Sequence, residues 1–397
     1  MGGAVTQAHV AHDIRLLLGA VDLFPALVKA MDTAQREVLL ETYIFDTAGA
    51  AAEVADAMFR AALRGVRVCL VVDGVGTREL SPLWRTRFEQ AGVQYRVYAP
   101  LSAGGLWRPR HWRRLHRKLC VVDQTLAFCG GINIMDDFLD PHIKGVLPQA
   151  RLDYAVSLRG PLVQAVHDTM TQLWSRLEAA RELRSKDVVG ALDALRSADQ
   201  TVHLPTRGTA QLVLRDNVLH RTRIERAYRK AIGVARQEIV LACAYFFPGL
   251  RLRRALVMAA LRGVRVRLLL QGHYEYFLPY HASRQLYGQL LAAGVEIYEY
   301  HASFLHAKVA VIDGHWVTVG SSNLDPLSLL LAREANVVVQ DPALAQALQS
   351  SLVDAMNSGS LRVDPQTYLQ RGWWLRALDR LASMVLRFGV FLTGKRY

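Results

Sequence analysis

Cysteine is scarce in this sequence, and the way its few cysteines are placed excludes two common stabilising devices. The four residues lie singly in apolar segments, without CxxC spacing or a matching histidine cluster: Cys69, Cys120, Cys129 and Cys243. This pattern supports neither a disulfide framework nor a zinc site. We therefore interpret them as reduced core residues in a cytosolic environment.

Long apolar runs are also missing. The sequence contains no stretch of about 18 apolar residues, so we expect no helix that spans a bilayer. The segment from Met1 to Arg15 contains His and Asp where an export signal needs an unbroken apolar core. Any contact with a membrane is expected to be peripheral.

Acidic residues are outnumbered by basic ones, which indicates an anionic partner. With 48 Lys and Arg against 35 Asp and Glu, the formal net charge is +13. Nucleic acid and the anionic leaflet of a bilayer both fit this charge. Because 51% of the residues are hydrophobic, a chain of 397 residues can bury a large core and is expected to fold as about two globular domains.

An internal repeat divides the chain into two similar halves. Each half contains an apolar segment, an aromatic cluster and an Arg-Gly-Val-Arg-Val sequence, in the same order. These segments are 36–40, 43–45 and 64–68 in the first half, and 237–241, 245–247 and 262–266 in the second. Strand-like and helix-like segments alternate in both, so the repeat predicts two α/β units whose sheets are covered by helices on both faces.

Each half ends in a motif that contains His, Lys, Asp and Asn at one spacing. The first copy is His116-Arg-Lys118, followed by Asp123 and by Gly130-Gly-Ile-Asn133. The second copy is His306-Ala-Lys308, followed by Asp313 and by Gly320-Ser-Ser-Asn323. Two matching copies on equivalent segments of a repeat are a much stronger signal than a single His-x-Lys.

The spacing has a structural consequence, because residues two apart in a strand lie on the same face. Each strand therefore presents an imidazole beside an ammonium, and two such strands facing one another would enclose a phosphate. The Gly-rich turns allow the backbone to approach a ligand closely. We expect three side chains of these turns to donate to phosphate oxygens: Asn133, Ser322 and Asn323.

A phosphodiester requires neutralisation of its oxygens, a nucleophile, and a proton for the leaving alcohol. The two His, two Lys and two Asn residues of the motifs supply all three, so we expect neither a metal nor a cofactor. One imidazole attacks phosphorus to give a phosphohistidine, and the other protonates the leaving oxygen and then deprotonates the incoming alcohol or water.

Four acidic residues each allow two interpretations. Asp123 and Asp313 follow their strands and either orient an imidazole, across the interface if needed, or cap a local turn; a structural and electrostatic role is favoured. Asp153 and Glu334 begin apolar runs at comparable places in the two halves. Such a carboxylate could support a catalytic His by holding its far nitrogen, or could be a solvated acid at the start of a strand.

The paired motifs resemble the two HKD motifs of the phospholipase D superfamily. Within it the chain resembles bacterial cardiolipin synthases of the short type without N-terminal transmembrane helices. The residues that carry this resemblance are Arg113-Arg-Leu-His-Arg-Lys118, Gly130-Gly-Ile-Asn133, Asp153-Tyr-Ala-Val156 with Gly160-Pro161, and Gly320-Ser-Ser-Asn-Leu-Asp325.

The resemblance implies two phospholipase D-type domains, each a mixed sheet flanked by helices, related by a pseudo-two-fold with the active site at their interface. We place the domains at residues 1–190 and 205–397, with motifs at 116–123 and 306–313. The linker is expected in the polar stretch 184–208, and a C-terminal amphipathic segment at 368–397.

The resemblance also implies the reaction. A phosphatidyl group passes from phosphatidylglycerol to the enzyme and then to a second phosphatidylglycerol, giving cardiolipin and glycerol. Its catalytic residues are His116, Lys118 and Asp123 in the first motif and His306, Lys308 and Asp313 in the second. In relatives the first His is the nucleophile, so His116 takes that role and His306 acts as acid and base.

The motifs specify the reaction better than the substrate, so other activities stay open. A phospholipase D-type hydrolase, a metal-independent nuclease and a catalytically silent membrane-binding protein are the alternatives. Features outside the motifs favour anionic phospholipid over nucleic acid, with the protein on the cytoplasmic face of the cell membrane as a peripheral protein. The sequence leaves the oligomeric state open.

Two segments are the basis for preferring phospholipid over nucleic acid as the partner. In residues 106–118, five arginines interleave with Trp107 and Trp112, which suits anionic headgroups, a nucleic-acid backbone or a solvated loop. In residues 368–397, apolar and basic residues follow helical spacing, which predicts an interfacial helix or one packed on the domain or on a dimer partner. A third segment, with aromatic residues at Tyr274, Tyr276 and Phe277, is explained by an acyl-chain entrance or by core packing.

Overall fold

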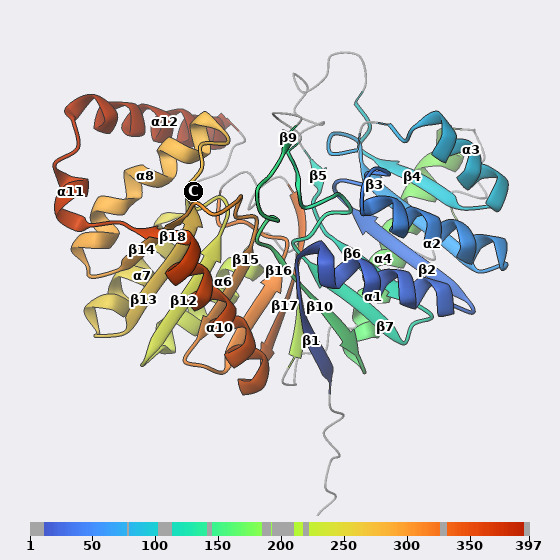
Figure 1. Cartoon of the computed structure of the whole chain (residues 1–397), viewed down its shortest axis with the longest axis horizontal. Coiled ribbons are helices and arrows are strands. Elements are labelled where there is room, and N and C mark those ends of the chain that lie inside the picture. The colour runs from blue at the N-terminus through green and yellow to red at the C-terminus, as the bar shows by residue number, and fades with distance from the viewer. Residues whose placement is uncertain are drawn as a thin grey trace, which may run out of the picture.

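The computed structural model describes residues 12–77, 79–101, 113–140, 145–184, 192, 210–216, 222–325 and 332–392. Within these residues the chain forms two large sheets side by side, each flanked by helices (Figure 1). The first half of the chain lies at the right of Figure 1 and the second half at the left. The predicted α/β fold with two helix-flanked mixed sheets is confirmed.

The first half builds a seven-stranded mixed sheet in the order β1-β10-β7-β6-β2-β3-β4. β2, β3 and β4 are parallel to one another, and the remaining neighbours are antiparallel. Its elements are β1 (Asp13–Leu18), α1 (Gly19–Thr33), β2 (Glu37–Thr42), α2 (Ala51–Leu63), β3 (Arg67–Asp73), α3 (Pro82–Ala91), β4 (Gln94–Tyr98), β6 (Leu119–Val122), β7 (Leu126–Gly130), β10 (Tyr154–Arg159) and α4 (Leu162–Arg184). Short strands β5 (Arg114–Leu115), β8 (Leu139–Asp140) and β9 (Gly145–Val146) lie outside this sheet.

The second half repeats this topology, in the order β11-β17-β16-β15-β12-β13-β14, and adds β18 at the edge. Its elements are β11 (Ala210–Arg215), α6 (Arg223–Val234), β12 (Glu238–Cys243), α7 (Leu250–Leu261), β13 (Arg265–Gln271), α8 (Phe277–Ala292), β14 (Glu296–Tyr300), β15 (Lys308–Ile312), β16 (Trp316–Gly320), β17 (Ala332–Gln340), α10 (Pro342–Gly359), β18 (Ser360–Arg362), α11 (Pro365–Leu369) and α12 (Trp373–Leu392). The repeat seen in the sequence is therefore a repeat of structure. The expected boundary between residues 190 and 205 lies outside the described residues, apart from residue 192.

Helix ends follow local sequence signals. Ser81 caps α3 by accepting a hydrogen bond from the Trp84 amide, and Gly92 ends that helix in the left-handed conformation. Asp341 caps α10 by accepting from the amides of Ala343 and Leu344. Since α10 begins directly after β17, this cap fixes the end of the strand that carries Glu334.

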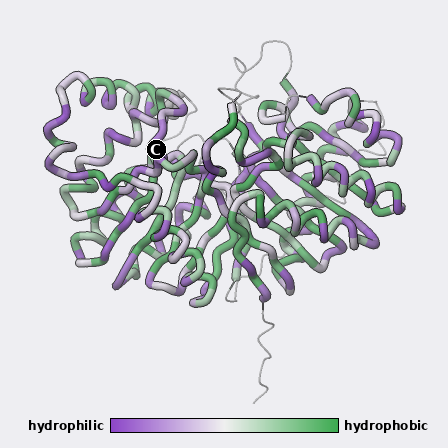
Figure 2. The backbone as a smooth tube through the Cα atoms, viewed as in Figure 1, coloured by the Kyte–Doolittle hydropathy of each residue, from purple (hydrophilic) through white to green (hydrophobic). Residues whose placement is uncertain are grey.

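The core has three layers. Helices α1, α2 and α3 cover the outer face of the first sheet, and α6, α7 and α8 cover the outer face of the second. Between the sheets lies one continuous apolar cluster with residues from both halves, such as Val121, Val156, Val317 and Val337. Apolar residues accordingly follow the central strands in Figure 2. Burying this shared layer holds the two halves together.

The two halves exchange short segments at their interface. Arg114 and Leu115 of β5 pair in parallel with Ala332 and Arg333 of β17. Reciprocally, Leu152 forms a parallel bridge with Leu305. The segment that leads into each motif is therefore held by the other half, in both directions, as an approximate two-fold relation requires. This exchange brings the two motifs together.

Candidate active site

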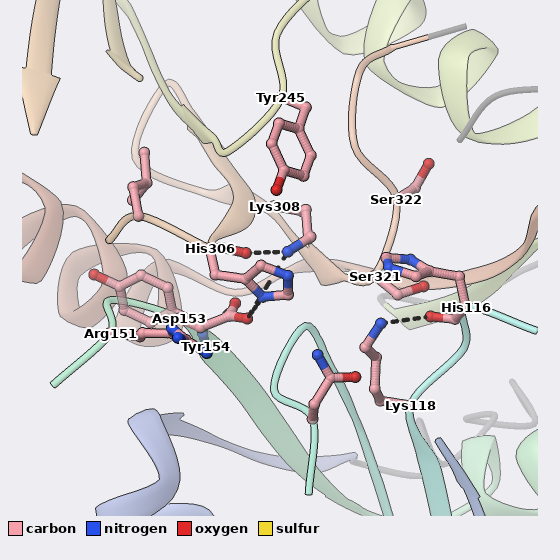
Figure 3. A network of polar contacts seen from close by, with 12 residues as sticks. His116, Lys118, Arg151, Asp153, Tyr154, Tyr245, His306, Lys308, Ser321 and Ser322 are labelled. Carbon is pink, nitrogen blue, oxygen red and sulfur yellow. Dashed lines mark hydrogen bonds and ion pairs between the residues drawn. The ribbon is translucent and has the colours of Figure 1, made fainter. Parts of the chain in front are cut away.

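The two motifs meet where the exchanged segments end. The His116 amide donates to the Arg333 carbonyl at 3.0 Å, and the His306 amide donates to the Leu152 carbonyl at 2.9 Å. Lys118 directly precedes β6, and Lys308 is the first residue of β15. Figure 3 shows the His and Lys side chains of the two halves facing one another across the interface.

Each histidine is held by a carboxylate from the other half. Nδ1 of His116 lies 3.1 Å from a carboxylate oxygen of Glu334, and Nδ1 of His306 lies 2.5 Å from Oδ2 of Asp153. A carboxylate at Nδ1 favours the tautomer that carries its proton there, which leaves the Nε2 lone pair for chemistry. The pairing is crossed, so neither half holds a complete His–carboxylate pair.

The two carboxylates occupy equivalent positions but have different neighbours. Asp153 immediately precedes β10, and Glu334 is the third residue of the equivalent strand β17. Ser321 Oγ donates to Glu334 Oε2 at 2.5 Å. The equivalent position in the first half is Gly131, which has no side chain and lies against the Asp153 carboxylate. The repeat is thus asymmetric at this point.

This asymmetry appears in the electrostatics. Burial raises the pKa of Asp153 to about 6, although Lys308 opposes the shift. Burial also acts to raise the pKa of Glu334, but the charge and hydrogen bond of His116, together with Lys118 and Ser321, outweigh it and hold that pKa below its usual value. Glu334 is therefore the more fully ionised of the two carboxylates near neutral pH.

The cationic side chains of the site are destabilised in their charged forms. Burial, and then the charge of Lys308, lowers the pKa of Lys118 to about 7. Burial likewise lowers the pKa of Lys308 and of His116. It lowers the pKa of His306 well below its usual value, and the charges of the two lysines add to that shift. An excess of buried positive charge is relieved by a bound anion, so this arrangement is suited to a phosphodiester.

The lysines are fixed by the backbone of their own motifs. Lys118 Nζ donates to the His116 carbonyl at 2.9 Å, and Lys308 Nζ donates to the His306 carbonyl. Both side chains are buried. An ammonium has three donors, so each lysine has donors left for a phosphate oxygen.

The predicted phosphate-binding residues are placed differently from one another. Asn133 and Asn323 are both buried at the turns after β7 and β16. Asn133 accepts from the Ile44 amide through its oxygen at 3.2 Å, which leaves its amide nitrogen as a donor. The Ser322 hydroxyl donates to the Asn323 carbonyl, and Figure 3 shows Ser322 directed away from the two histidines. Its neighbour Ser321, which the sequence did not single out, reaches the site through Glu334.

Asp123 and Asp313 lie at the far ends of the motif strands. Asp123 accepts from the amides of residues 35, 36 and 37 at 2.8 to 2.9 Å, and Asp313 accepts from those of residues 236, 237 and 238 at 2.8 to 3.0 Å. Each aspartate is five positions beyond its lysine, which is about 16 Å at the usual rise of a strand. Their carboxylates therefore fix the segment before β2 or β12.

Two tyrosines complete the walls of the site. The ring of Tyr43 lies 5.0 Å from that of His116, and Lys118 Nζ lies 5.5 Å from the same ring. Burial raises the pKa of Tyr43 to about 12, so it stays neutral. Tyr245 lies two positions beyond β12, one position further along than Tyr43 lies beyond β2, and donates to Glu275 at 2.7 Å. In the sequence these residues served only as markers of the repeat.

Part of the basic segment before the first motif is not a surface patch. Arg114 donates to Asp73 at 3.0 Å, and Arg117 is buried and paired with Glu41 at 2.8 Å. These two arginines therefore support the structure and are not available for headgroups. Arg113 is exposed, whereas residues 106–112, with both tryptophans, lie outside the described residues. In the part of the chain that is described, no three His, Cys, Asp or Glu side chains are grouped as metal ligands would be.

Two repeated halves that each contribute a His-x-Lys strand to one shared site define the phospholipase D class. The chain belongs to the family described as "Cardiolipin synthase, PLD-like domain", whose model matches residues 27–142 and 228–355. The matched regions contain both motifs. The family suggested by the motifs is confirmed.

Relatives match almost the whole chain. It is 36% identical over 391 residues to cardiolipin synthase B of Escherichia coli K12, covering 96% of this chain and 89% of that protein. It is 29% identical to the probable cardiolipin synthase YwiE of Bacillus subtilis 168, covering 94% and 71%. Phosphatidylserine synthase of Haemophilus influenzae Rd KW20 superposes with a TM-score of 0.67 at 12% identity, covering 96% of this chain and 93% of the other, and shows the same fold.

Proposed function

We propose that this protein transfers a phosphatidyl group from one phosphatidylglycerol to another, giving cardiolipin and glycerol. The observation that carries the proposal is the pair of crossed His–carboxylate contacts, with a buried lysine beside each histidine. These groups supply a nucleophile, an acid and base, and positive charge around one phosphate. Membership of the cardiolipin synthase family supports the lipid substrate.

The first step forms the covalent intermediate. His116 Nε2 attacks phosphorus while Glu334 accepts the hydrogen bond from its Nδ1–H. The bond from phosphorus to the glycerol oxygen breaks, and that oxygen takes the proton of His306. The anionic phosphodiester raises the proton affinity of His306, which burial and the two lysines lower in the free site.

The second step releases the product. The glycerol hydroxyl of a second phosphatidylglycerol gives its proton to His306, and its oxygen attacks the phosphorus held by His116. A new P–O bond forms and the P–N bond breaks, so both histidines return to their starting state. Water in place of the acceptor lipid would give phosphatidic acid by the same route.

The asymmetry of the carboxylates supports this order. The imidazole that bonds to phosphorus becomes cationic, and Glu334, which is ionised and bonded to Ser321, stabilises that charge better than Asp153 with its pKa of about 6. We therefore assign His116 as the nucleophile. Lys118, Lys308, Asn133 and Asn323 bind the phosphate oxygens, whereas Asp123 and Asp313 hold the motif strands in place.

Helix α12 supports peripheral contact with an anionic membrane. Its buried seam consists of Asp379, Ala382, Ser383 and Leu386, which face the domain, and the helix contacts α8. Most of its large apolar side chains are exposed: Trp373, Trp374, Leu375, Leu381, Met384, Val385 and Phe388. A helix of a soluble domain normally buries its apolar stripe. Here that stripe is outside, although the helix is packed on the domain.

The outer face of α12 has the composition of an interfacial helix. Trp373 is 72% exposed and Phe388 is 61% exposed, and Arg376, Arg380 and Arg387 are exposed among the apolar residues. Aromatic rings at headgroup depth and arginines beside anionic phosphates suit the cytoplasmic face of a cell membrane. α12 lies along one edge of the molecule in Figure 1, and Figure 2 shows that apolar residues are frequent along it. None of the helices in the described ranges is long and apolar enough to cross a bilayer.

The test is incubation of purified protein with phosphatidylglycerol vesicles, with the lipid products resolved by mass and double-stranded DNA as a parallel substrate. Cardiolipin that is absent with His116→Ala supports the proposal. Phosphatidic acid alone would show a hydrolase, and DNA cleavage without lipid turnover would show a nuclease.

A further inference from the structure

An open hollow lies beside the motif of the second half. Its lining includes Tyr245, Gln271, His273, Glu275, Tyr280 and Ser283. The residues come from the end of β13, the loop after it and the first turns of α8, together with the residue two positions beyond β12.

Residues that line the hollow are bonded to the backbone next to the catalytic residues. The Gln271 side chain exchanges two hydrogen bonds with the backbone of Leu305, at 3.3 and 3.4 Å, and Leu305 immediately precedes His306. The Ala244 amide donates to the Ala307 carbonyl at 3.0 Å, which places Tyr245 beside Lys308. Figure 3 shows the Tyr245 hydroxyl directed toward Lys308 and His306.

The lining combines aromatic rings and Pro279 with several polar groups. Tyr245 donates to Glu275 Oε2 at 2.7 Å, and His273 Nε2 lies 2.8 Å from the His301 carbonyl. Arg284, at the rim, is neutralised by Glu299 at 2.6 Å. Apart from Arg284, the polar groups of the lining are one carboxylate and several hydroxyl, amide and imidazole groups. A vicinal diol both donates and accepts, and its two hydroxyls can donate to the two oxygens of one carboxylate.

In the described residues of the first half, the loop after β3 is bonded to the segment after β2. Thr77 Oγ1 donates to the Tyr43 carbonyl at 3.0 Å and accepts from the Phe45 amide at 2.8 Å. Gly76 lies so close to Tyr43 that a side chain there would collide with its carbonyl. Asp73, which occupies the position of Gln271, is bonded to the Val75 amide and to Arg114. The described part of the loop after β3 is therefore held against the backbone after β2, whereas the loop after β13 borders the hollow.

We propose that this hollow binds the glycerol headgroup at the site of leaving and incoming alcohols, and that Glu275 and Tyr245 select a vicinal diol there. The inference rests on the proposed function with His116 as nucleophile. The leaving oxygen then departs on the side of His306, and Gln271 of the hollow is bonded to Leu305, the residue before His306. The acceptor attacks along the same path in reverse, so one subsite serves the glycerol of the donor and that of the acceptor.

The chemistry of transfer is unchanged by this subsite. The acceptor oxygen bonds to phosphorus, its proton passes to His306, and the bond from phosphorus to His116 breaks. Glu275 and Tyr245 hold the neighbouring hydroxyl so that the reacting one points at phosphorus. A site that hydrogen-bonds a substrate hydroxyl discriminates strongly against analogues that lack it.

The test separates acceptor choice from formation of the intermediate. Phosphatidyl-p-nitrophenol in vesicles serves as donor, because it has no glycerol headgroup and its nitrophenol release reports formation of the phosphatidyl-enzyme. Glycerol and 1-propanol compete as acceptors, and phosphatidylglycerol and phosphatidylpropanol are resolved by mass. We expect the unmodified protein to prefer glycerol by roughly tenfold or more, since a hydrogen bond to a charged group has at least this effect.

In Glu275→Gln and in Tyr245→Phe we expect the ratio of phosphatidylglycerol to phosphatidylpropanol to fall roughly tenfold. Glu53→Gln, an exposed carboxylate on α2, is the matched control and should keep the original ratio. A comparison that needs no variant uses 1,2-propanediol against 1,3-propanediol, where the vicinal isomer should be preferred.

An unchanged ratio in both variants, or no preference for glycerol by the unmodified protein, would overturn the subsite and leave the transferase intact. Nitrophenol release without transfer to any alcohol would instead overturn the proposed function. The two failures are therefore distinguishable in one assay.

Discussion

Glu334, in the second half of the chain, lies 3.1 Å from Nδ1 of His116, in the first half. Two hundred and eighteen positions separate these residues in sequence. The contact exists because β5 pairs with β17, which places the end of the first-half segment beside the strand that carries Glu334. Asp153 and His306 are related in the same way through Leu152 and Leu305.

Glu334→Gln is expected to lower kcat by roughly 100- to 10,000-fold with little change in KM, because the amide disfavours the imidazole tautomer with its lone pair at Nε2. Asp153→Asn should also lower kcat, with its main effect on the step in which His306 transfers a proton. Steady-state kinetics on phosphatidylglycerol vesicles measures both, with Glu53→Gln as a control for loss of a carboxylate. A kcat within a factor of two of the original in Glu334→Gln would contradict the assignment.

Asp123→Asn is expected to lower the free energy of unfolding by about 1 to 3 kcal/mol, because hydrogen bonds to a charged acceptor are weakened. Asp123 accepts three backbone hydrogen bonds, and although burial acts to raise its pKa, those bonds hold the pKa below 3.8 in the folded state. The contribution of Asp123 to the free energy of unfolding is therefore complete well above pH 3.8. It disappears as the pH falls through the lower pKa of the folded state.

The measurement is urea unfolding at pH 7 and at pH 3. The difference between the unmodified protein and Asp123→Asn should be large at pH 7 and smaller at pH 3. Asp313→Asn should behave in the same way because its hydrogen bonds are equivalent. A stability difference that grows toward low pH would contradict a lowered pKa of Asp123 in the folded state.

Lys118 is expected to make anion binding depend on pH. Burial and Lys308 lower the pKa of Lys118 to about 7, so its ammonium is charged below that pH and neutral above it. Sulfate, whose own charge does not change in this range, should bind roughly tenfold more tightly at pH 6 than at pH 8.5. Calorimetry measures the affinity; Lys118→Ala should remove most of the dependence, and the exposed Lys230→Ala should retain it.

Removal of the outer face of α12 should weaken binding to anionic vesicles. We expect the combined change Trp373→Ser, Met384→Ser and Phe388→Ser to lower the partition coefficient at least tenfold, since roughly 1.5 to 3 kcal/mol is lost per apolar side chain that had inserted. The control changes three equally exposed apolar residues on other helices, Val21, Leu83 and Val234, to Ser. If both triple variants bind vesicles as strongly as the unmodified protein in a sedimentation assay, α12 is excluded as the membrane contact.

Much of the fold and both motifs could be predicted because they depend on local patterns. Period-two alternation places His116 beside Lys118 and His306 beside Lys308, and the repeated segments fix the order of strands and helices. The family resemblance followed from the same residues. These features need no knowledge of which strands become neighbours.

The remaining features depend on contacts between distant segments. The sequence suggested Asp153 and Glu334 as supports for histidines, but not which histidine each would reach, because that depends on the exchange of segments between halves. It proposed Ser322 and passed over Ser321, since both lie in the same turn and only the backbone geometry decides which hydroxyl faces Glu334. Comparing Gly131 with Ser321 across the repeat would have shown the difference.

Whether a residue is exposed or buried was hardest to predict for the aromatic and basic residues. The arginines at 114 and 117 have the same local pattern as a headgroup patch, yet buried acids from other segments bind both of them. Periodicity shows that α12 is amphipathic but does not show which face packs on α8. Only the structure shows that Asp379 and Ser383 are inside and Trp373 outside.

The most direct test of the account is to trap the covalent intermediate. In His306→Ala the proton donor is missing, but phosphatidyl-p-nitrophenol has a leaving group that does not need one. The account predicts a burst of about one nitrophenol per protein molecule, slow turnover afterwards, and a phosphatidyl group found by mass spectrometry on the peptide that contains His116. A phosphatidyl group on His306 in His116→Ala, with no burst in His306→Ala, would contradict it.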